Sequence, residues 1–117
     1  MSIHGEVTMS HEALLIQLGY GVNESTLMHI KRISDNTRGF EYVQTHLVAL
    51  HDALKRYNAF VALSNNQDYF KIKIGEQEAI NNLEEVQSLI HKWSEKYKIA
   101  LEKVPNKHTY YIIGYQS

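Results

Sequence analysis

The stretch 40-FEYVQTHLVALHDALKRY-57 decides the fold, because it carries the clearest periodic pattern in the chain. Its apolar residues recur at steps of three and four and so share one stripe of a helix: Phe40, Val43, Leu47, Leu50, Leu54 and Tyr57. The pattern predicts a long amphipathic helix. Such a helix either covers a sheet of its own domain or forms the seam of a homodimer. The first use is favoured because the stripe is too short for a stable coiled coil.

Two shorter helices are predicted before this stretch. Ser10 is a suitable N-cap for a helix over residues 11–19, and either Asn23 or Ser25 caps a second helix. The apolar face of the second helix comprises Leu27, Ile30 and Ile33.

The segment that joins the second helix to Phe40 is turn-forming. Residues 34–39 read SDNTRG, and Gly39 is their only strong helix breaker. One kinked helix over residues 25–57 is therefore an alternative to two separate helices. At the N-terminus, residues 1–9 show no clear period and predict a loose tail or a short edge strand.

After Tyr57 the apolar period changes from helical to two, which is typical of strands. Phe60–Ser64 and Tyr69–Ile74 flank the loop Asn65–Asp68 and predict a β-hairpin. A second amphipathic helix is predicted over Glu76–Tyr97, and two further strands over residues 99–104 and 108–115. We therefore predict one α+β domain spanning residues 1–117. Its N-terminal helices are followed by a ββαββ unit that forms a four-stranded, mainly antiparallel sheet.

The last strand is 108-HTYYIIGY-115. One of its faces carries Tyr110, Ile112 and Gly114, and the other carries Tyr111, Ile113 and Tyr115, so both faces are apolar or aromatic. This composition predicts a strand that is central in the sheet or covered on both sides. If one face is uncovered, its tyrosines suit a protein interface, because they bury a large area at a low entropy cost. The residues predicted to bind a partner are Tyr69, Tyr111, Ile113 and Tyr115.

Composition excludes several classes of function. The 117 residues are 44% hydrophobic and 21% charged, as in ordinary globular proteins. Twelve basic and 13 acidic residues give a formal charge of −1, so no global field directs the chain to nucleic acid or to a membrane. Cysteine is absent, which removes disulfides and thiol chemistry. No signal peptide or apolar membrane span is present, and we expect a cytoplasmic protein.

The segment 21-GVNESTLMHIKRI-33 resembles the turn and second helix of helix-turn-helix DNA-binding domains. The resemblance covers residues 11–34. It departs from the usual pattern at Gln17, where a small residue is expected, and in a turn lengthened by Gly19 and Tyr20. The resemblance implies a recognition helix whose DNA-contacting residues are Thr26, His29, Lys31 and Arg32.

No residue pattern predicts a metal site, a cofactor or a catalytic group. Seven histidines are present, but His46 and His51 are five residues apart and so lie about 140° apart around a helix. His11-Glu12 lacks the second histidine of a zinc-protease motif, and there is no nucleophile elbow or phosphate loop. An enzyme without a recognisable motif therefore remains only the third alternative.

The sequence favours a small regulatory or protein-interaction domain without catalytic activity. Its expected partner is another protein or a second copy of the chain, as a homodimer. The second hypothesis is a helix-turn-helix DNA-binding regulator. An exposed aromatic patch would support the first hypothesis, and a protruding second helix with a free His29–Arg32 edge would support the second.

Overall fold

The computed structural model of the protein describes residues 9–76 and 81–116. The elements follow in the order α1 (His11–Gln17), α2 (Glu24–Asn36), α3 (Phe40–Leu54), the 3-10 turn η1 (Lys55–Tyr57), β1 (Ala59–Leu63), β2 (Phe70–Ile74), α5 (Leu83–Tyr97), β3 (Ile99–Lys103) and β4 (Thr109–Tyr115). The predicted fold class is confirmed: N-terminal helices precede a ββαββ unit.

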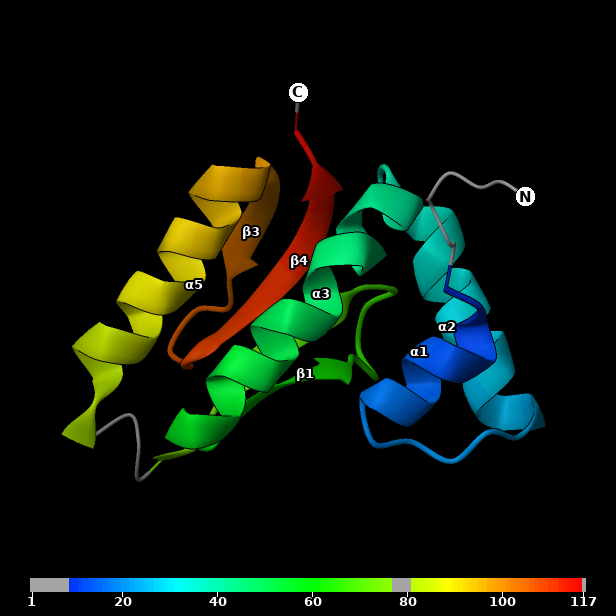
Figure 1. Cartoon of the computed structure of the whole chain (residues 1–117), viewed down its shortest axis with the longest axis horizontal. Coiled ribbons are helices and arrows are strands. Elements are labelled where there is room, and N and C mark those ends of the chain that lie inside the picture. The colour runs from blue at the N-terminus through cyan, green and yellow to red at the C-terminus, as the bar shows by residue number, and fades with distance from the viewer. Residues whose placement is uncertain (1–8, 77–80, 117) are drawn as a thin grey trace.

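The four strands form one antiparallel sheet in the order β1-β2-β4-β3. The last strand is therefore central, the first of its two predicted arrangements, and β1 and β3 are the two edges. Figure 1 shows α3 and α5 lying across one face of the sheet, while α1 and α2 form a pair beside β1. In the part of the chain that the structure describes, no helix covers the opposite face.

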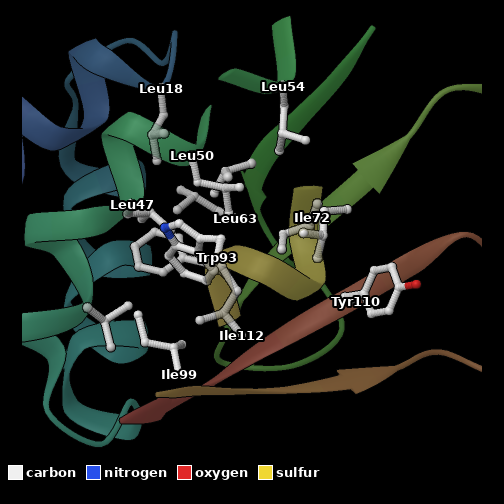
Figure 2. Packing of buried hydrophobic residues seen from close by; sticks show 14 of the residues in the cluster. Leu18, Leu47, Leu50, Leu54, Leu63, Ile72, Trp93, Ile99, Tyr110 and Ile112 are labelled. Carbon is white, nitrogen blue, oxygen red and sulfur yellow. The ribbon is translucent and has the colours of Figure 1, made fainter. Parts of the chain in front are cut away.

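The core lies between the two long helices and the sheet. The predicted stripe of α3 faces inward, and Val43, Leu47, Leu50 and Leu54 are all at most 1% exposed. Figure 2 shows leucines of α3 and Trp93 of α5 packed against strand residues such as Ile72 and Ile112. Each fully buried aliphatic side chain contributes roughly 1.5–3 kcal/mol, so this layer accounts for much of the folding free energy.

Local signals set the ends of the helices. Ser10 Oγ accepts a hydrogen bond from Ala13 N, and Asn23 forms a capping box with Thr26, which confirms Ser10 and Asn23 as N-caps. Gly39 adopts φ 63°, so residues 25–57 form two helices rather than one kinked helix.

The predicted helix over Glu76–Tyr97 is interrupted in the structure: Glu76 and Asn81 are helical, but Asn82 is not. Asn82 has φ −134° and ψ 26°, which is not helical, and α5 begins only at Leu83. Residues 77–80 of the predicted helix, and residues 1–8 of the predicted tail, lie outside the described residues.

The turn between α2 and α3 extends the sheet beside the end of β4. Arg38 bridges Gly114, and the carbonyl oxygen of Arg38 accepts a hydrogen bond from Tyr115 N at 2.8 Å. Gly114 has φ 145°, and a Cβ atom there would lie 2.7 Å from the main-chain N and O of Arg38. Only glycine permits this close approach of two backbones.

Candidate functional site

The candidate site is the face of the sheet that lies opposite α3 and α5. Register places Phe60 beside Lys73, Lys71 beside Tyr111, and Tyr111 beside Glu102, so these side chains share one face and cross all four strands. We call this surface the open face: Phe60, Tyr69, Lys71, Lys73, Glu102, Thr109, Tyr111 and Ile113.

Exposure differs between the open face and the helix-covered face, except at Ala62, which pairs with Lys71 on the open face but is only 6% exposed. Phe60 is 41% exposed, whereas its neighbours Ala59 and Val61 on the covered face are 2% and 1% exposed. In β4, Tyr111 and Ile113 are half-buried, whereas Ile112 between them is fully buried. The open face thus offers apolar and aromatic side chains to a partner.

Aromatic and basic groups lie next to one another on this face. The rings of Tyr69 and Tyr111 are 6.1 Å apart between centroids, which is within the range of aromatic contact. A hollow of about 340 Å3 beside them is lined in part by Lys71, Lys73, Lys107 and Tyr111. Glu76 is the acidic residue in this lining, so the hollow carries a positive balance of charge.

Three of the four predicted partner-binding residues lie on the open face, and Tyr115 does not. The register pairs Tyr115 with Ile99 and Gly114 with Ala100, but Leu101 with Ile112, which leaves Ile113 as the extra residue of a β-bulge. The bulge breaks the alternation of faces. The ring of Tyr115 therefore contacts Tyr42 of α3, with 4.7 Å between centroids.

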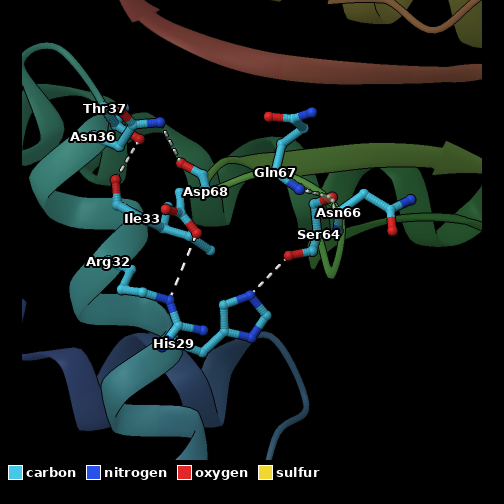
Figure 3. A network of polar contacts seen from close by, with 9 residues as sticks. All are labelled: His29, Arg32, Ile33, Asn36, Thr37, Ser64, Asn66, Gln67 and Asp68. Carbon is cyan, nitrogen blue, oxygen red and sulfur yellow. Dashed lines mark hydrogen bonds and ion pairs between the residues drawn. The ribbon is translucent and has the colours of Figure 1, made fainter.

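Two of the predicted DNA-contacting residues hold the loop between β1 and β2 (Figure 3). His29 Nε2 lies 2.7 Å from the carbonyl oxygen of Ser64, and because a carbonyl only accepts, Nε2 carries the proton and donates it. Arg32 Nε lies 3.6 Å from Asp68 Oδ1. Asn36 Nδ2 adds a hydrogen bond to the carbonyl of Asp68 at 3.0 Å.

The other two residues contact their own helix. Thr26 Oγ1 belongs to the capping box and donates to the carbonyl of Gly21 at 2.8 Å. Lys31 Nζ pairs with Asp35 at 3.0 Å, and both side chains are about two-thirds exposed. The edge of α2 that DNA binding requires is thus partly engaged with the protein itself. The helix-turn-helix function stays a prediction.

The structure also shows how the β1 edge of the sheet is protected, which the sequence did not indicate. Val61 N donates to His51 Nδ1 at 3.1 Å, and Leu63 N donates to the hydroxyl of Tyr20 at 3.0 Å. These amides point away from β2 and would otherwise be free to pair with another strand. The two contacts therefore occupy two of the outward amides of this edge.

Two histidines, His46 and His51, have a pKa below the usual value for histidine. Burial, and then the charge of Lys55, lower the pKa of His51, while Asp52 acts in the opposite direction. Burial and the charge of Lys96 lower the pKa of His46, whose ring stacks on Tyr97 with 3.8 Å between centroids. Both groups favour the neutral imidazole, which His51 needs in order to accept the bond from Val61.

The described residues contain no group of three or more His, Cys, Asp or Glu side chains placed to hold a metal ion. None of the helices in residues 9–76 and 81–116 is both long and apolar enough to cross a membrane. The cytoplasmic location stays a prediction. Comparisons with protein families, with curated proteins and with solved structures found no match to this chain.

Proposed function

We propose that the chain is a protein-interaction domain that binds an acidic segment of a partner protein on its open face. The observation that carries the proposal is the continuous row Phe60, Lys73, Lys71 and Tyr111, which register and exposure place on a face without a covering helix in the described residues. An apolar and aromatic surface of this kind is typical of an interaction site.

The charges on this face indicate the kind of partner. The open face carries two basic side chains, Lys71 and Lys73, and one acidic side chain, Glu102, so it favours a partner with an acidic surface. A second copy docked face to face would bring its own two lysines to the same interface, which is unfavourable. We therefore favour a different protein over the homodimer through this face.

Photo-crosslinking in cells that express the chain tests the proposal. The photoreactive residue p-benzoylphenylalanine replaces Tyr111 in one variant, and replaces Met28 on α2 in the control, where the native side chain is 56% exposed. We expect a discrete protein adduct from position 111 and none from position 28.

Each outcome of the crosslinking experiment has a definite meaning. A partner that is identified by mass spectrometry, and whose purified form binds the chain, supports the proposal. An adduct of twice the mass of the chain assigns the face to a homodimer and overturns the acidic partner. A nucleic-acid adduct, or no adduct at position 111, also overturns it.

A further inference from the structure

The two edges of the sheet are treated differently by the fold. At the β1 edge, side chains of His51 and Tyr20 occupy the amides of Val61 and Leu63. At the β3 edge, the carbonyl of Ile99 accepts a hydrogen bond from Ser94 Oγ at 2.6 Å. Among the described residues, it is the one outward main-chain group of β3 that is bonded to a side chain. The β3 edge is therefore more open to pairing.

Hydrogen-bond alternation identifies which groups of β3 point outward. The carbonyl of Lys98 accepts from Gln116 N, and Val104 N donates to Thr109 O, so even-numbered residues bond toward β4. In an antiparallel strand the intervening residues point their N–H and C=O groups the other way. Leu101 and Lys103 thus present their amides and carbonyls at the free edge of the sheet.

A groove runs beside this edge, between β3 and α5, which lie together at the margin of the sheet (Figure 1). Its volume is about 880 Å3. Its lining includes His91 and Glu95 of α5, Leu101 and Lys103 of β3, and Lys98 between the two elements. A strand added at β3 would point every second side chain into this groove.

The polar groups of the groove favour a ligand with carboxylates. Lys98 and Lys103 exceed the single carboxylate of Glu95. The hydroxyl of Tyr110 accepts from Gln87 Nε2 at 3.2 Å and keeps its own proton for an acceptor. The ring of His91 lies edge-on to Tyr110 at 5.8 Å, so these donors are gathered along one wall.

A second copy of the chain fits this groove poorly. In β3 the side chain of Ile99 is 1% exposed, and Leu101 packs against the core. The inward side chains of a paired β3 would thus already be covered by their own α5, and would leave the groove unfilled. A separate extended segment brings side chains that are free to fill it.

We propose that the free edge of β3 accepts an extended, carboxylate-bearing peptide segment of a partner protein as a fifth strand, with alternate side chains in the groove beside α5. The main-chain bonds supply affinity, and the groove supplies the preference for sequence. This inference concerns a different surface from the open face and does not depend on it.

The test uses random peptides displayed on phage, which are selected on the full-length chain and then synthesised. Binding of each peptide is measured by calorimetry, and its location by chemical shifts of backbone amides. Lys103→Pro removes an outward N–H without touching the β3–β4 bonds, whereas Lys103→Ala removes the same side chain and keeps the N–H. We expect Lys103→Pro to bind about tenfold more weakly than Lys103→Ala.

Equal binding by the two variants overturns the inference, and so does a failure to select any peptide. Peptides that shift the amides of the open face instead of β3 overturn it while supporting the open face as an interface. If the chain forms a dimer without peptide, and Lys103→Pro dissociates that dimer, the edge binds a second copy of the chain. This result would also overturn the inference. If Lys103→Pro does not fold, N-methylation along the peptide decides, because loss of binding at alternate residues supports strand addition.

Discussion

The imidazole of His51 accepts a hydrogen bond through Nδ1 from the main-chain N–H of Val61, at 3.1 Å. One residue of the core-facing helix α3 thereby closes part of the free edge of β1. The side chain of His51 is buried, with 7% of the residue exposed. The bond exists only while the ring is neutral at Nδ1, which makes the contact sensitive to pH.

We predict that the protein loses stability as the pH falls below about 6.5, the usual pKa of histidine. Burial lowers the pKa of His51 in the folded protein, so the unfolded chain binds more protons in this range. The contribution of His51 is complete above pH 6.5 and is lost as the pH falls through its lower folded pKa. Urea unfolding at a series of pH values measures this dependence.

His51→Gln is the control for this prediction, because its amide oxygen also accepts a hydrogen bond but does not titrate. Its free energy of unfolding should depend less on pH than that of the native protein. Residual dependence is expected from His46, whose pKa is also lowered. An identical pH dependence in both proteins would contradict the role assigned to His51.

Tyr20→Phe should lower the free energy of unfolding by about 1–2 kcal/mol, because it leaves the part-buried amide of Leu63 without its acceptor. Tyr57→Phe is the matched control. The hydroxyl of Tyr57 makes only an exposed 3.4 Å contact with Glu85, so its loss should have little effect. Denaturant titration of both variants decides, and equal effects would refute the protective role of Tyr20.

Gly114→Ala should destabilise the fold by at least about 2 kcal/mol, through its positive φ and its contact with the backbone of Arg38. Gly21→Ala is the control, since its φ is ordinary and a Cβ atom there meets nothing within 4 Å. Thermal unfolding compares the two variants. A native-like melting temperature for Gly114→Ala would show that the Arg38–Gly114 bridge is not required.

His29→Ala should cost about 1 kcal/mol, because it removes the 2.7 Å hydrogen bond that joins α2 to the β1–β2 loop. Lys31→Ala should cost less than about 0.5 kcal/mol, since its ion pair is exposed. Binding of labelled duplex DNA by the same variants examines the helix-turn-helix hypothesis. Salt-dependent DNA binding that Lys31→Ala weakens while the fold stays intact would favour that hypothesis over ours.

The sequence predicts the elements whose signals are local. The stripe of Leu47, Leu50 and Leu54 marks a helix that packs on a sheet, and the alternation of Phe70, Ile72 and Ile74 marks a strand with one wet face. Each of these patterns depends only on neighbours along the chain. They were sufficient for the fold class.

The face of Tyr115 and the bonded amides of the β1 edge depend on contacts between distant residues. The bulge at Ile113 accompanies the approach of Arg38 to Gly114, which no local pattern announces. The bond between Leu63 and Tyr20 joins residues 43 positions apart. Of the open face, Tyr69, Tyr111 and Ile113 could be predicted, but their neighbours Phe60 and Lys73 required the register of the strands.

Binding of the crosslinked partner to a charge-reversed open face tests the central claim most directly. The variant carries Lys71→Glu and Lys73→Glu, both on the open face, and the control carries Lys31→Glu on α2. Calorimetry with the purified partner should show binding about tenfold weaker or worse for the double variant, and nearly native binding for the control. Native affinity in a folded double variant would contradict the claim that the open face binds an acidic partner.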